Sequence, residues 1–320
     1  MHEHDWAMHD AREHVDCVNV LIAHGADLNK ENSCGETPLT IAAAFGQPEV
    51  IKILVAAGAD RNKADNYSLS TPLFVAVQNN HLQAVQALID AGADVDKGRT
   101  TDGGTPLFVA AQKNHLQAVQ ALIDAGADAD KERTTTGCTP LIVAAEENHL
   151  QVVRALIDAG ADVDKGTTDG CTPLFMAAQN NHLQAVHALI AAGADVDKAS
   201  NGDVVGHSLV IAGTPLFIAA RTGHLQIVRA LVGSGADLYK VGGLGRLRTP
   251  LATATENGRT EVVLCLERAA RNHSRYELLL CVKLGRDEVN AGRGDDLHPL
   301  LSLFAQTPAE VIREHILGFM

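Results

Sequence analysis

The sequence predicts an all-α repeat solenoid, in which pairs of short helices stack along one axis and each pair carries a projecting hairpin turn. Two observations predict it. The segment HLQAVQALIDAGAD occurs unchanged at residues 81–94 and 115–128, with close variants at 149–165, 182–198 and 224–240. The triplet Thr-Pro-Leu recurs seven times, in steps of 34, 34, 34, 33, 42 and 35 residues. Such periodicity is typical of folds whose units bury their apolar sides only against one another.

Residues 105–138 illustrate how one unit is predicted to fold. Thr105 and Pro106 begin the first helix, because threonine caps a helix and proline fits its first turn. Asn114 ends that helix, and His115 opens a second one with apolar residues at helical spacing. Gly126 ends the second helix, since glycine adopts the positive φ found at helix C-termini. The following stretch, rich in Lys, Thr and Gly, is predicted to be a projecting turn.

This order of motifs, Thr-Pro-Leu, then paired alanines, then a helix ending in Gly-Ala-Asp, resembles the ankyrin repeat. The resemblance covers residues 1–269, and the first copy is degenerate, with His4-Asp5-Trp6 where Thr-Pro-Leu is expected. The repeats are placed near residues 4–36, 37–70, 71–104, 105–138, 139–171, 172–213, 214–248 and 249–269. Residues 270–320 are expected to form a helical C-terminal cap or a diverged last repeat.

The sequence departs from the ankyrin pattern in two columns. Where the family has His after Thr-Pro-Leu, this chain has Thr40, Phe74, Phe108, Ile142, Phe175, Phe217 and Ala252. We expect these residues to fill the space between repeats, although a ligand-binding stripe is an alternative. Where the family has Asn after Gly-Ala-Asp-Val, the chain has Asp at 96, 130, 164 and 197. Because a carboxylate lacks the amide donor, we expect weaker hydrogen bonding between turns.

One loop breaks the period. The connection between Gly193 and Thr214 is 9 residues longer than a 33-residue unit requires, and it contains several Val, Leu and Ile residues. It is either a β-hairpin folded back on the array or a projection that contacts a partner, and the sequence leaves both open.

The sequence predicts no active site, no cofactor and no metal, and therefore no enzyme. His81, His115, His149, His182 and His224 recur once per repeat, but packed helices lie about 8–10 Å apart, too far for neighbouring rings to share a zinc ion. We interpret this histidine column as a polar residue at each helix start. The six cysteines lack metal-ligand spacing and are expected to be reduced thiols. No phosphate-binding loop or nucleophile motif is present.

Composition restricts the class of partner. The net charge of −13, from 26 basic and 39 acidic residues, disfavours nucleic-acid binding because phosphate is repelled. The polar start of the chain argues against a secretory signal, and Gly, Thr and Pro interrupt the longest apolar run, Val204–Ala220. We expect a monomeric intracellular protein without membrane insertion, in the cytoplasm, with the nucleus left open.

The resemblance implies a protein-protein interaction module or scaffold that binds partner proteins through a concave groove and the hairpin tips. The candidate groove residues, which vary between otherwise similar repeats, are Phe45, Gln78, Asn79, Gln112, Lys113, Glu146, Glu147, Gln179, Asn180, Arg221 and Thr222. The candidate tip residues are Arg99, Thr100, Asp102, Arg133, Thr134 and Asp169. The alternative is a substrate-recognition adaptor whose C-terminal segment recruits an enzyme such as a ubiquitin ligase.

Overall fold

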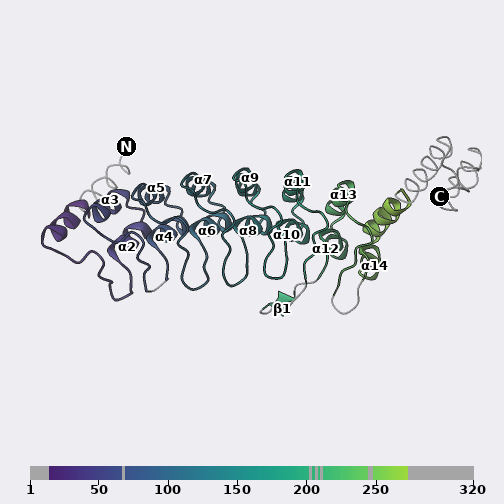
Figure 1. Ribbon diagram of the computed structural model, residues 1–320, viewed down its shortest axis with the longest axis horizontal. Coiled ribbons are helices and arrows are strands. Elements are labelled where there is room, and N and C mark those ends of the chain that lie inside the picture. Colours follow the sequence, from purple (N-terminus) through teal and green to yellow (C-terminus); the bar gives the residue numbers. More distant parts are fainter. Residues whose placement is uncertain are drawn as a thin grey trace, which may run out of the picture.

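The computed structural model describes residues 14–66, 69–201, 204–205, 208–209, 212–243 and 248–272, with the side chains of 204–205 and 208–209 left aside. This part of the chain forms an elongated array of antiparallel helix pairs in two rows, an inner and an outer one (Figure 1). The turns between successive pairs project from the inner row, on the side away from the outer row (Figure 1). The predicted all-α repeat solenoid is confirmed.

The helices alternate between the rows in chain order. The inner helices are α2 (Pro38–Ala44), α4 (Pro72–Gln78), α6 (Pro106–Gln112), α8 (Pro140–Glu146), α10 (Pro173–Gln179), α12 (Pro215–Thr222) and α14 (Pro250–Glu256). The outer helices are α3 (Pro48–Ala56), α5 (Leu82–Asp90), α7 (Leu116–Asp124), α9 (Leu150–Asp158), α11 (Leu183–Ala191) and α13 (Leu225–Gly233). Residues 14–23 and 260–272 are also helical, at the two ends of the array.

Local sequence explains where these helices begin and end. The hydroxyl of Thr105 accepts the N–H of Phe108 at 3.1 Å, Pro106 occupies the first helical position, and the same arrangement recurs in the other inner helices. Asn114 has φ 59°, the left-handed conformation that often ends a helix. The sequence placed the end of the first helix at this residue. The short inner helices therefore follow from capping residues that every repeat carries.

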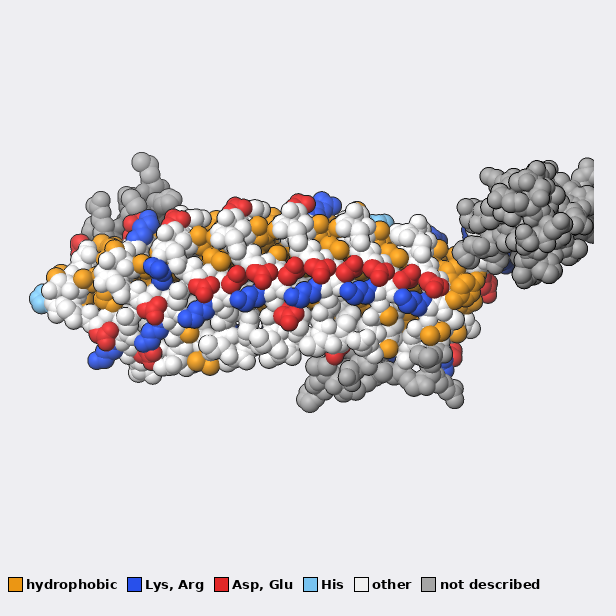
Figure 2. Space-filling model, in the orientation of Figure 1, with side chains coloured by type: hydrophobic (Ala, Val, Ile, Leu, Met, Phe, Trp, Pro, Cys, Tyr) orange, Lys and Arg blue, Asp and Glu red, His pale blue; other side chains and the backbone are white. Residues whose placement is uncertain are grey.

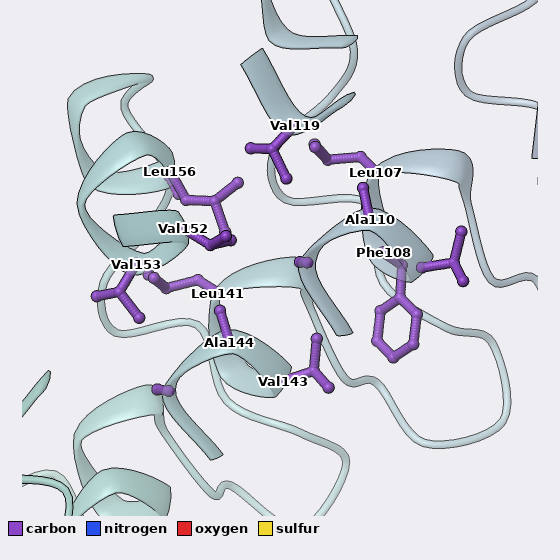
Figure 3. Close-up of a cluster of buried hydrophobic side chains, with 14 of the residues drawn as sticks. Leu107, Phe108, Ala110, Val119, Leu141, Val143, Ala144, Val152, Val153 and Leu156 are labelled. Atoms are coloured by element: carbon purple, nitrogen blue, oxygen red, sulfur yellow. The ribbon is translucent and has the colours of Figure 1, made fainter. Parts of the chain in front are cut away.

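The core lies between the rows and between neighbouring repeats. Leu107, Ala110, Leu141 and Ala144 are completely buried in a cluster that draws on α6, α7, α8 and α9 (Figure 3). The small alanines allow the inner helices to approach closely, so each repeat covers the apolar side of the next. The column after Thr-Pro-Leu is equally buried, with at most 4% of each side chain exposed at positions 74, 108, 142, 175 and 217. Thr40 is also buried, whereas Ala252 is half-buried, so the expected role in filling the space between repeats is confirmed for the column except at Ala252.

The aspartates two residues after Gly-Ala-Asp link successive turns, so the missing amide donor does not abolish these bonds. Asp96 Oδ1 accepts the backbone N–H of Asp128 at 3.1 Å, and Asn62 Oδ1 accepts that of Asp94 at 2.9 Å. The bond requires an acceptor rather than an amide donor, and a carboxylate supplies one. The same bond joins Asp130 to Asp162, Asp164 to Asp195 and Asp197 to Asp237. Figure 2 shows acidic side chains in a row along the array, with basic side chains beside them.

The enlarged loop contains a β-hairpin. Strand β1 (Val204–Val205) pairs antiparallel with β2 (Ser208–Leu209), and Ser200 bridges to Gly213 at the base. The backbone thus has the hairpin form that the sequence allowed, while contact with a partner stays a prediction.

Several sequence expectations fall near or beyond the limits of the described residues. The degenerate start at residues 4–6 and most of the cap, residues 273–320, lie outside them. The last described helix, 260–272, continues through residue 269, where the sequence placed the end of the array. Within the described residues, no helix is long and apolar enough to cross a membrane.

Candidate protein-binding surface

The predicted groove residues form a continuous row, the inner-end row, at the C-terminal ends of the inner helices. In each repeat the pair follows directly on buried residues: Ala110 and Ala111 are completely buried, whereas Gln112 and Lys113 are exposed. Phe45, Gln78, Asn79, Glu147, Gln179 and Asn180 are likewise exposed. Glu146, Arg221 and Thr222 are half-buried. The side chains of the row therefore differ from repeat to repeat, while the helices that carry them stay the same.

Two members of the row also bond to the preceding repeat. Asn79 Nδ2 donates to the backbone oxygen of Ala44 at 3.3 Å, and Asn180 Nδ2 donates to that of Glu146 at 3.4 Å. These bonds fix the asparagine side chains along the array.

The histidine column lies beside this row and joins neighbouring repeats. A ring nitrogen of His115 bonds to the carbonyl oxygen of Val77 at 2.9 Å, and His149 contacts Ala111 in the same way at 2.9 Å. His81, His182 and His224 make equivalent bonds at 3.0 Å. The rings bond to carbonyls at the C-terminal ends of inner helices, of which those of Val77 and Ala111 also accept the backbone N–H groups of Asn80 and Asn114. Among the described residues, no group of three or more His, Cys, Asp or Glu side chains is arranged to hold a metal ion.

Three of the predicted tip residues form a charged network. Asp102, only 7% exposed, accepts hydrogen bonds from Arg99 Nε at 3.1 Å and Nη2 at 2.7 Å, from Arg133 Nη2 at 2.5 Å and from the N–H of Gly104 at 3.1 Å. The hydrogen bonds from Arg99, followed by those from Gly104 and Arg133, hold the pKa of Asp102 well below its usual range. This network connects two repeats, because Arg133 belongs to the next one.

The same two arginines stack on the buried phenylalanines. The Arg99 guanidinium lies 5.3 Å from the ring centre of Phe74, and that of Arg133 lies 5.1 Å from the ring centre of Phe108. Both distances are typical of cation–π contacts. Arg99, Asp102 and Arg133 thus have partners within the chain.

The remaining tip residues are more accessible. Thr100 and Thr134 are exposed, and their backbone N–H groups donate to the preceding tip, at Leu69 and Asp102, at 3.1 and 3.0 Å. Asp169 is half-buried, and its backbone oxygen accepts from Asn201 at 2.8 Å. The tips are therefore joined by backbone bonds, to which the Thr100 hydroxyl adds a bond to the Leu69 oxygen at 3.4 Å.

Negative charge gathers in the middle of the inner-end row. Burial, together with the neighbouring Glu147 carboxylate and against the effect of His182, raises the pKa of Glu146. Both glutamates lie at the C-terminal end of α8, where the helix itself presents partial negative charge. Within the described part of the chain, neither forms an ion pair within 4.0 Å.

An apolar pocket lies at the N-terminal end of the same row. It has a volume of about 720 Å³ and lies between the helix of residues 14–23, α2 and α3. Phe45, 72% exposed, and Leu21, 58% exposed, form part of its lining. The sequence indicated Phe45 but not the pocket, because the pocket lining comes from three separate helices.

The described cysteines offer no reactive thiol in the core. Burial raises the pKa of Cys138 to about 12 and that of Cys171 to about 11. A thiol with such a pKa is protonated at neutral pH and is a poor nucleophile. Both cysteines are free, as the sequence predicts.

Comparison with known proteins identifies the repeats. A family profile for ankyrin repeats in three copies matches residues 5–100, 60–133, 107–200 and 160–241. The chain is similar to protein phosphatase 1 regulatory subunit 27 of Mus musculus, 37% identical over 62 residues, and to that of Homo sapiens, 36% identical over 62 residues. It is also similar to the probable E3 ubiquitin-protein ligase XBOS33 of Oryza sativa subsp. japonica, 38% identical over 58 residues.

These similarities are short. Each phosphatase subunit match covers 19% of this chain and 40% of the relative, and the ligase match covers 18% and 11%. A match of this length is shorter than two repeats, so by itself it does not establish a shared partner.

Proposed function

Because the chain belongs to the ankyrin repeat family, whose repeats form protein-interaction modules, we propose that it binds partner proteins along the inner-end row and acts as a scaffold without catalysis of its own. One observation carries this proposal. The row is exposed or half-buried and changes from Gln-Asn to Gln-Lys, Glu-Glu and Arg-Thr, while the residues directly before these pairs, alanine in most repeats and Val77 in one, stay buried. A surface that varies on a fixed scaffold can select partners without altering the fold.

The hairpin tips form the second part of the proposed surface. Thr100, Thr134 and Asp169 present accessible side chains there. Arg99, Asp102 and Arg133 contribute chiefly to stacking, since Asp102 pairs with both arginines within the chain. The hairpin at 199–213 is proposed as a further contact. That the protein is a monomer and lies inside the cell stays a prediction.

Proximity labelling in cells tests this proposal. The full chain is compared with the Glu146→Lys/Glu147→Lys variant and with a variant lacking residues 200–211. We expect the double variant to lose a subset of labelled proteins, because like charges then face a partner that docks there. Its free energy of unfolding should stay within about 1 kcal/mol of that of the unmodified chain, since the substitutions leave the stacking residues untouched.

The matched control is Asp124→Lys/Asp158→Lys, which changes the charge by the same amount at the ends of outer helices. The proposal fails if the inner-end variant and this control label the same proteins as the unmodified chain. It also fails if the control alone loses partners, since recognition would then lie on the outer row.

A substrate-recognition adaptor is the second candidate, favoured by the similarity to a probable E3 ubiquitin-protein ligase. In that case residues 270–320 would recruit the enzyme while the array binds the substrate. A pull-down with and without 270–320 separates the two candidates. Loss of ligase components with retention of other partners supports the adaptor, and an unchanged set of captured proteins rejects it.

A further inference from the structure

Phe45 differs in kind from the rest of the inner-end row. It is the C-cap residue of α2, and the corresponding C-cap residues are Asn79, Lys113, Glu147, Asn180 and Asn257. All of these are polar or charged, whereas Phe45 is apolar and 72% exposed beside the pocket at the N-terminal end of the array. A bulky apolar side chain placed in this pocket would remove its own surface and that of Phe45 from water.

The second distinctive position is the Glu146–Glu147 pair. These consecutive residues lie at a helix C-terminus, Glu146 is half-buried, and the Glu147 carboxylate acts against its charge, so the position is unfavourable for the chain alone. A Lys or Arg from a partner would relieve both the mutual repulsion and the interaction with the helix end. Lys113, one repeat earlier, would repel the same cation, which confines it to the glutamate pair.

The stacking of repeats fixes the separation between these two positions. Phe45 and Glu147 belong to α2 and α8, which are three repeat steps apart. Packed helices lie about 8–10 Å apart, so the two side chains are separated by about 24–30 Å along the array. An extended chain advances about 3.3 Å per residue and would span this distance with about 7–9 residues.

We propose that the surface from Phe45 to Glu147 binds an extended segment of a partner protein, with a bulky apolar residue in the pocket and a Lys or Arg, about 7–9 residues away, at the glutamate pair. This inference rests on the proposed function and specifies the chemistry of its partner. The protein's net charge of −13 favours the same occupant, because it attracts basic segments.

The test is selection of a phage-displayed random 20-residue peptide library on the full chain. Selected peptides should share an apolar residue and a basic residue at this separation. Phe45→Asn and Glu146→Gln/Glu147→Asn should each weaken their binding about tenfold, the loss of about 1.4 kcal/mol of interaction. Both variants install residues that other repeats already carry at these positions, in Gln78-Asn79 and Gln179-Asn180, so folding should be retained.

A register variant makes the test sharper. Combining Glu146→Gln/Glu147→Asn with Gln179→Glu/Asn180→Glu moves the acidic pair one repeat further from Phe45. Selection on this variant should lengthen the preferred separation by about three residues, since one repeat adds about 10 Å. Asp158→Asn, on an outer helix, is the control that should change nothing.

Three results would overturn the inference: no enriched peptides, a separation near 16–20 residues as a helical occupant would require, or a separation that ignores the register variant. The proposed function can survive these failures. If substitution of Gln112 or Arg221, and not of Phe45 or the glutamate pair, weakens binding of the selected peptides, the inner-end row still binds partners. Only the chemistry specified for the partner is then wrong. If no change in the row affects binding, both proposals fail.

Discussion

The charged network at the hairpin tips gives the most quantitative prediction. Replacing Asp102 by Asn keeps the size of the side chain but removes the charge that two arginines share. The amide oxygen can still accept one or two hydrogen bonds, while its NH₂ group faces cations. Arg99 and Arg133 would then be held close together without a counter-ion.

The magnitude follows from burial. Removing one partner of a buried ion pair usually costs about 3–5 kcal/mol. Here Asp102 is buried, but the Arg99 and Arg133 side chains are 34% and 28% exposed, so water can solvate them in part. We therefore expect Asp102→Asn to lower the free energy of unfolding by about 2–3 kcal/mol at pH 7.

The pH dependence identifies the cause. Since folding lowers the pKa of Asp102, its contribution is present above the usual value of 3.8 and is lost as the pH falls through the folded-state value. The difference between the unmodified chain and Asp102→Asn should be complete at pH 7 and should shrink below about pH 4. Urea denaturation across this range measures it, and amide exchange should locate the loss in the repeats of α6 and α8.

Asp169→Asn is the matched control, because Asp169 occupies the same position before Thr-Pro-Leu and makes no ion pair among the described residues. It should change stability by about 0.5 kcal/mol or less. If Asp102→Asn behaves like this control at pH 7, or if its effect is independent of pH, the network does not stabilise the stack.

Three further predictions concern the stack. Ala144→Asp introduces an unpaired charge at a fully buried position and should cost about 3–5 kcal/mol, with amide protection lost nearest α8 and retained in distant repeats; uniform loss would contradict a linear array. His115→Ala removes the ring that bonds to the Val77 carbonyl and should lower the free energy of unfolding by about 1 kcal/mol. EDTA should leave the melting curve of the unmodified chain unchanged. A large shift with EDTA would instead indicate a metal bound by the histidine column. Glu146→Gln should raise the melting temperature at pH 7. Folding raises the pKa of Glu146, so its ionised form destabilises the folded state as the pH rises, and glutamine carries no charge. The melting temperatures of the variant and the unmodified chain should converge below about pH 4, where the carboxyl group is protonated.

The helices and the core could be predicted from sequence because their causes are local and repeated. Thr105 and Pro106 start a helix, Asn114 and Gly126 stop one, and apolar residues at helical spacing mark the buried side. Each of these signals acts within a few residues, so it survives without knowledge of the neighbouring repeat. The inner-end row was predictable for a related reason, since it is the part of the repeat whose residues change.

Only the tertiary structure decided what joins one repeat to the next. The bond from His115 to Val77 spans 38 residues, that from Asp128 to Asp96 spans 32, and that from Arg133 to Asp102 spans 31. Sequence alone described His115 as a polar residue at a helix start, expected the aspartates to form weaker bonds between turns, and placed Asp102 at a hairpin tip, but it named none of these three bonding partners. Each assignment depends on which atoms the stacking brings within about 3 Å, and that register is set by close packing of the alanine-lined inner helices, which no single repeat contains.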